Sequence, residues 1–135
     1  MGKLRLIALV YMLILLGAAS LNYIPGLTDS EGRAFGVFAL DIYDDALHVA
    51  SAIWAGLAAA TSSRAARIFL LCFGLLYLSD GLMGLVTGSG YLDLGIVLHG
   101  RLDLPLTFRI LANLPHIAGG AFGVFASRRF ANEAR

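Results

Sequence analysis

The sequence predicts an all-α integral membrane protein, a bundle of four transmembrane helices built as two parallel-repeat helical hairpins. The first observation is composition: 59% of the residues are apolar and 14% are charged, whereas soluble domains average about 45–50% and about 25%. The second is that the apolar residues gather into four long runs, and the third is that basic residues flank these runs at alternating ends. The net charge of +1 gives no reason to expect a nucleic-acid partner.

The four runs cover residues 6–21, 42–61, 68–86 and 108–126. A helix needs about 20 residues to cross the hydrocarbon core of a bilayer. Within lipid the backbone must satisfy its own hydrogen bonds, so each run is expected to be helical. The 135 residues then form a single membrane domain whose first partner is the lipid bilayer.

The basic residues predict the orientation. Seven of the ten lie at the two ends of the chain or between the second and third runs, and three lie in or beside the other two connections. The positive-inside rule places both termini in the cytoplasm and the two longer loops outside. The first run also resembles a secretory signal with small residues at 18–20, and cleavage there would leave the other three spans oriented as before.

The second and fourth runs resemble each other. The segment that begins at Asp45 and contains His48 aligns without a gap with the segment that begins at Asn113 and contains His116. Each segment places a carboxylate or amide three residues before a histidine. The first and third runs match more loosely, so we predict two hairpins of the same orientation, related by an axis along the membrane normal.

Small residues recur at a spacing of four in these runs. They include Gly119 with Gly123 and Gly84 with Gly88. Lipid supplies no hydrophobic drive for helix association, so small residues allow backbones to approach closely. We expect this packing within the monomer, with a homo-oligomer or a membrane-protein partner as the alternative.

Two histidines and one aspartate fall well inside the runs, away from their ends: His48, Asp80 and His116. At ~1.5 Å per residue, all three lie at a similar depth in the outer half of the bundle. Unpaired charge there costs roughly 2.5–3.5 kcal/mol, so these groups should face inward and meet. We expect a structural network in which Asp80 accepts from one histidine while Asp45 and Asn113 hold the imidazoles. The alternatives are a divalent metal on His48, His116 and Asp80, haem b between the histidines, a proton relay or a small-ligand pocket.

Outside this layer the sequence offers little chemistry. His99 lies in the second long loop and is expected to be solvated. The lone Cys72 excludes an internal disulfide. The chain has no phosphate loop, nucleophile elbow, zinc-protease motif or dinucleotide fingerprint. A non-enzymatic protein without a cofactor is therefore the expectation.

Several short motifs together resemble a known family. They are the Leu21–Gly26 segment, Asp45 with His48, Arg64 with Arg67, and Asn113 with His116 and Gly119. The chain is similar along nearly its whole length to the domain of unknown function 4383 family. The resemblance implies a bacterial multi-pass protein of the cytoplasmic membrane and implies no activity. Asp45 departs from the family pattern, which has Asn there, and so adds a carboxylate beside His48.

Overall fold

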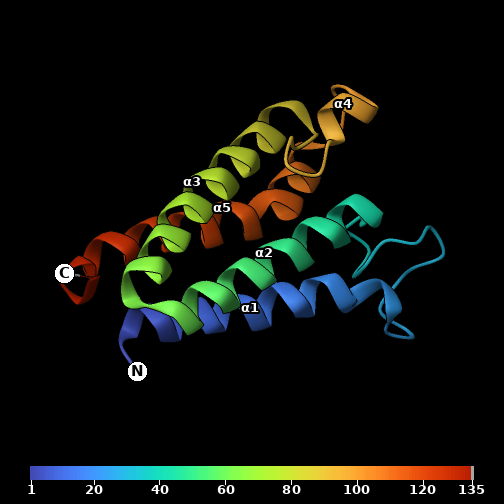
Figure 1. Ribbon diagram of the computed structural model, residues 1–135. Coiled ribbons are helices and arrows are strands. Elements are labelled where there is room, and N and C mark those ends of the chain that lie inside the picture. Colours follow the sequence, from blue (N-terminus) through green and yellow to red (C-terminus); the bar gives the residue numbers. More distant parts are fainter. Residues whose placement is uncertain (135) are drawn as a thin grey trace.

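The computed structural model describes residues 1–134, most of which lie in helices (Figure 1). The four long helices are α1 (Lys3–Ser20), α2 (Ile42–Thr61), α3 (Ser63–Thr87) and α5 (Leu106–Arg129). Shorter elements are η1 (Leu21–Tyr23), α4 (Gly95–His99) and η2 (Ala131–Ala134). The prediction of an all-α fold is confirmed.

Within residues 1–134, three helices are long and apolar enough to cross a membrane: Lys3–Tyr23, Ser63–Thr87 and Leu106–Arg129. Helix α2 is not among these three, because Asp44, Asp45 and His48 in its first turns lower its mean hydropathy. The apolar helices also keep large side chains on the surface, such as Leu13 and Phe125, which are 63% and 57% exposed. An apolar surface of this kind is suited to contact with lipid.

The helices pair as two consecutive hairpins. Helix α1 packs along α2, and α3 packs along α5 (Figure 1). Both termini and the turn between α2 and α3 lie at one end, which we call the terminal end. The first loop (residues 21–41) and the second loop (residues 88–105) lie at the opposite end, which we call the loop end. The hairpins converge at the terminal end and diverge toward the loop end.

Aromatic side chains join the two hairpins on the terminal side of the bundle. Phe69 is fully buried, and its ring packs edge-to-face against Tyr11 of α1 and Trp54 of α2. The Tyr11 hydroxyl donates to the carbonyl oxygen of Gly119 on α5, at 2.6 Å. Side chains of α1, α2 and α3 and the backbone of α5 therefore meet here and close this half of the bundle.

Glycines let α3 and α5 approach closely, and of the predicted pair on α5 only Gly123 lies at the contact. A Cβ on Gly120 would lie 2.7 Å from Leu78 Cα, and one on Gly123 would lie 2.9 Å from the Leu70 carbonyl oxygen. A Cβ on Gly119 would meet nothing within 4 Å. Packing within the monomer thus uses Gly123 with Gly120, while Gly119 contributes its carbonyl group.

Side-chain carboxylates accept backbone hydrogen bonds at the start of α2 and in the first loop. Asp41 caps α2: its side chain accepts from the backbone N–H groups of Tyr43 and Asp44, and the Asp44 side chain accepts from Asp41 N at 3.0 Å. This reciprocal arrangement is a capping box. In the first loop, the backbone N–H of Arg33 donates to Asp29 and is the main reason that the pKa of this carboxyl lies below its usual range. The capping box thus fixes the residue at which α2 begins.

Candidate functional site

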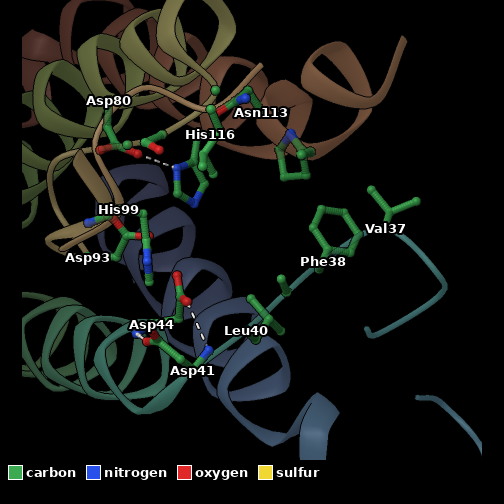
Figure 2. Close-up of a pocket in the computed structure, with 18 of the residues that line it drawn as sticks. Val37, Phe38, Leu40, Asp41, Asp44, Asp80, Asp93, His99, Asn113 and His116 are labelled. Atoms are coloured by element: carbon green, nitrogen blue, oxygen red, sulfur yellow. Dashed lines mark hydrogen bonds and ion pairs between the residues drawn. The ribbon is translucent and has the colours of Figure 1, made fainter. Parts of the chain in front are cut away.

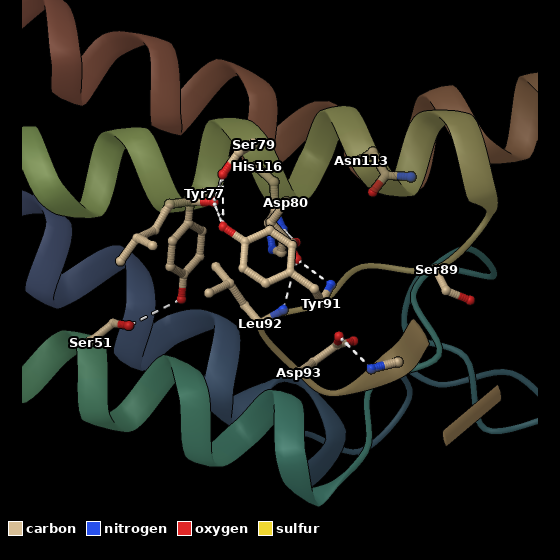
Figure 3. A network of polar contacts seen from close by, with 12 residues as sticks. Ser51, Tyr77, Ser79, Asp80, Ser89, Tyr91, Leu92, Asp93, Asn113 and His116 are labelled. Atoms are coloured by element: carbon tan, nitrogen blue, oxygen red, sulfur yellow. Dashed lines mark hydrogen bonds and ion pairs between the residues drawn. The ribbon is translucent and has the colours of Figure 1, made fainter. Parts of the chain in front are cut away.

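Asp80 is the centre of the polar layer. This residue of α3 is only 2% exposed, and both of its carboxylate oxygens are occupied (Figure 3). Oδ1 accepts hydrogen bonds from the backbone N–H groups of Tyr91 and Leu92, at 2.6 and 2.9 Å. Oδ2 lies 2.7 Å from His116 Nδ1 on α5. One side chain therefore joins α3, α5 and the second loop.

The close approach of the second loop depends on Gly90. A Cβ at this position would lie 2.8 Å from Asp80 Oδ1 and would push the loop away from the carboxylate. A backbone donor has no signature in the sequence, so the contacts from Tyr91 and Leu92 could not be predicted. The only signal was the cluster of glycines at positions 88 and 90 beside an intramembrane carboxylate.

The two histidines lie next to each other. The ring centroids of His48 and His116 are 6.3 Å apart, and the rings are inclined by 73°. The His116 ring also lies 4.9 Å from that of Tyr77, whose hydroxyl is 3.1 Å from Ser51 Oγ. His48 is buried, and its Nδ1 has no hydrogen-bond partner within residues 1–134. The structure thus brings together Asp80, His116 and His48, but only His116 is bonded to the carboxylate.

Asp45 and Asn113 do not hold the imidazoles, contrary to the expectation from the sequence. The Asp45 carboxylate accepts from the Tyr23 hydroxyl at 2.8 Å, which ties α2 to η1. The Asn113 amide donates to the backbone oxygen of Arg109 at 2.8 Å and packs where a Cβ on Gly84 would have to lie. Each side chain finds a nearer partner than the histidine one turn away, so both belong to the packing around the layer.

A cavity of about 560 Å³ opens between the two hairpins at the loop end, and we call it the loop-end cavity (Figure 2). His48, Asp80 and His116 form part of its wall. The first and second loops supply much of the remainder. The polar layer is therefore the inner boundary of a space that the two loops partly cover.

The loop-end cavity is lined by ionisable groups that the sequence analysis did not connect with the layer. Asp41 and Asp44 come from the start of α2, and Asp93 and His99 come from the second loop (Figure 2). The Asp44 and Asp93 carboxylates interact with each other across the space between α2 and the second loop. His99 is exposed as expected, but it is exposed to the cavity.

His48, His116 and Asp80 do not form a complete set of ligands for a metal ion. Across residues 1–134, no three side chains of His, Cys, Asp or Glu converge as they would around an ion. Asp80 directs Oδ2 at His116 and Oδ1 at the second loop, so its oxygens are already bonded.

Comparison with known proteins gives a family. A family model described as a domain of unknown function, DUF4383, matches residues 5–96. The chain belongs to the DUF4383 family. The match runs from α1 through α3 into α4, so it includes His48 and Asp80 and ends before His116. No curated protein and no solved structure matches the chain.

Proposed function

We propose that this DUF4383 protein is a non-enzymatic, four-span protein of the bacterial cytoplasmic membrane, in which the polar layer holds the bundle together. The observation that carries the proposal is the set of contacts made by Asp80. A buried carboxylate that accepts two backbone N–H groups and bonds a histidine on a second helix acts as a structural anchor. It fixes α3, α5 and the second loop relative to one another.

The distribution of side chains on α2 supports the fourth span. Its polar residues Asp44, Asp45 and His48 are buried in the protein. On the opposite side, Ile53 and Leu57 are 56% and 64% exposed. A helix with polar groups turned inward and apolar groups turned outward is what a lipid-facing helix of a bundle requires. With 20 residues, α2 is also long enough to cross the hydrocarbon core.

The two hairpins support the proposed repeat and orientation. Each hairpin pairs a helix of the first type (α1 or α3) with a histidine-bearing helix (α2 or α5). The terminal end carries most of the basic residues, so it faces the cytoplasm under the positive-inside rule. The loop end, with the polar layer and its cavity, then faces outward.

A metal or haem site is the second candidate, and the proximity of His48 and His116 is the observation that favours it. Neutral imidazoles are common ligands of zinc and of haem iron. Metal analysis and a visible absorption spectrum of the purified protein test it. A colourless protein that holds no stoichiometric metal supports the structural role. A Soret band or one metal per chain would replace it with the cofactor role.

Cysteine accessibility tests the four spans and their orientation. Ser30 lies in the first loop and Thr61 ends α2, and both are exposed. In a Cys72→Ser background, we expect Ser30→Cys to react with a membrane-impermeant maleimide in intact cells. Thr61→Cys should react only after permeabilisation, because α2 carries the chain back to the cytoplasm.

Two other outcomes contradict the proposal. Labelling of both cysteines in intact cells would mean that α2 does not cross the membrane. Labelling of Thr61→Cys alone would mean that the orientation is reversed. A reporter fused to the C-terminus provides an independent control and should read as cytoplasmic.

A further inference from the structure

We propose that the loop-end cavity binds an organic cation with an apolar body, whose ammonium group lies between Asp44, Asp93 and His48. This inference goes beyond the structural role of the polar layer and does not depend on the topology. It rests on the charge of the lining, on unpartnered polar atoms in the wall, and on the apolar surface that completes the cavity.

The charged lining is entirely suited to a cation. Four aspartates and three histidines border the loop-end cavity, and no lysine or arginine of residues 1–134 does. An anionic ligand would therefore meet carboxylates without a compensating charge. An ammonium group would gain favourable electrostatics and could donate up to three hydrogen bonds.

Asp44 and Asp93 each have one carboxylate oxygen bonded to a backbone N–H group. Asp44 Oδ2 accepts from Asp41 N at 3.0 Å, and Asp93 Oδ1 accepts from Gly95 N at 2.9 Å (Figure 3 shows the Asp93 contact). The two carboxyl groups also hydrogen-bond with each other across the cavity, so an ammonium group placed between them would take the position of the proton that they share. Asp80 differs, because both of its oxygens are occupied. The acidic pair rather than Asp80 is the place for a positive charge.

Two buried polar atoms in the wall of the cavity also lack partners. His48 is 6% exposed and Ser89 is 6% exposed, and both line the cavity. His48 Nδ1 and Ser89 Oγ have no hydrogen-bond partner within residues 1–134. Buried polar groups are almost always satisfied in native proteins. A ligand with hydrogen-bond donors would satisfy the imidazole nitrogen and the hydroxyl oxygen, which are independent of the acidic pair.

The rest of the lining suits an apolar body. Phe38 and Leu40 of the first loop face the cavity from one side, and Leu102 and Phe108 line it from the other (Figure 2 labels Phe38 and Leu40). The volume of about 560 Å³ falls within the range of about 300–1,000 Å³ that is typical of small-molecule sites. A metal ion is a poorer fit, because most of this surface would remain empty.

The test uses full-length protein that has been stripped of lipid in a neutral detergent. The probe is 2-phenylethylammonium, compared with 2-phenylethanol, which has a similar size and no charge. Binding is measured by equilibrium dialysis and by the shift in melting temperature. We expect saturable binding of the cation and at least tenfold weaker binding of the alcohol.

Three conservative variants locate the site. Asp44→Asn and Asp93→Asn remove the charge but keep an oxygen that can accept from Asp41 N and Gly95 N. We expect each to weaken cation binding at least tenfold while the melting temperature without probe is unchanged. Asp103→Asn is the matched control, because Asp103 is exposed in the same loop as Asp93 and does not line the cavity. It should bind as the parent does.

The ammonium group could belong to a soluble amine or to the headgroup of a lipid such as phosphatidylethanolamine. Native mass spectrometry of the protein before lipid removal separates the two sources. One bound phosphatidylethanolamine in the parent that is lost in Asp93→Asn identifies the lipid, and its absence together with probe binding identifies a soluble amine. Either result supports the proposal. Equal binding of the cation and the alcohol, no binding of either, or full binding by Asp93→Asn would overturn it.

Discussion

At the scale of single residues, the most important feature is that both carboxylate oxygens of Asp80 are hydrogen-bonded. A carboxylate at 2% exposure would be costly if its oxygens were unpaired. Each hydrogen bond to Asp80 also links α3 to another part of the chain, because the donors belong to α5 and to the second loop. The same residue that would destabilise an apolar bundle therefore sets the positions of α5 and of the second loop.

Replacing Asp80 should accordingly destabilise the protein. Asp80→Ala leaves His116 Nδ1 and two backbone N–H groups without their acceptor, and we expect the free energy of unfolding to fall by roughly 1–3 kcal/mol. Unfolding of the detergent-solubilised protein with increasing dodecyl sulfate measures the change. Asp103→Ala is the control and should unfold like the parent. If Asp80→Ala also unfolds like the parent, the anchor role is wrong.

Ionisable residues within apolar runs could be identified from the sequence. His48, Asp80 and His116 could be found because ionisable groups are rare in apolar runs. Asp44 and Asp93 could not be linked to them, because one lies at a helix start and the other in a loop, where carboxylates are ordinary. Their proximity depends on the path of the second loop, and backbone contacts to Asp80 determine that path.

At the scale of elements, the contact between α3 and α5, here called the seam, requires glycine only at particular positions. Gly119 and Gly120 are neighbours in sequence, yet only Gly120 faces the backbone of α3. The predicted pair of Gly119 and Gly123 was right for Gly123, which faces α3, and wrong for Gly119, whose place at the contact is taken by Gly120. A register of this kind depends on how α5 is rotated about its axis, and apolar residues on every side of a membrane helix obscure that rotation.

The pair of neighbouring glycines allows a matched test. Gly120→Ala places a Cβ against the Leu78 backbone, which cannot move aside as a flexible side chain could. We expect overpacking to lower the free energy of unfolding by about 1–3 kcal/mol. Gly119→Ala adds the same methyl group where nothing lies within 4 Å and should leave stability unchanged or slightly raised. Equal losses in both variants would show that the seam lies elsewhere. The same unfolding assay in dodecyl sulfate provides the measurement.

At the scale of the whole molecule, one end of the bundle is closed and the other is open. Aromatic rings join the hairpins on the terminal side, whereas at the loop end the space between them is a cavity under two loops. The similarity between runs predicted two consecutive hairpins, and the helices do pair in that way. The cavity could not be predicted, because it results from the divergence of the hairpins, and no local pattern records the angle between them.

The packing of Phe69 against Tyr11 and Trp54, which we call the aromatic closure, should therefore control how firmly the two hairpins are held together. Phe69 is fully buried and contacts α1 and α2 from α3. In soluble proteins, truncating a buried phenylalanine to alanine costs roughly 3–5 kcal/mol. Lipid is as apolar as a protein core, so only the packing part of that cost applies, and we expect Phe69→Ala to lower the free energy of unfolding by about 2 kcal/mol.

Phe125→Ala is the matched control for the same measurement in dodecyl sulfate. Phe125 lies on α5 and is 57% exposed, so its ring faces lipid or detergent and its loss should change stability little. Spin labels at Ser30 and Leu98, one in each loop, should also show a broader distance distribution in Phe69→Ala than in the parent, because a loosened closure lets the hairpins swing apart at the loop end. An unchanged distribution together with unchanged unfolding would mean that the loops, rather than the aromatic rings, hold the hairpins together.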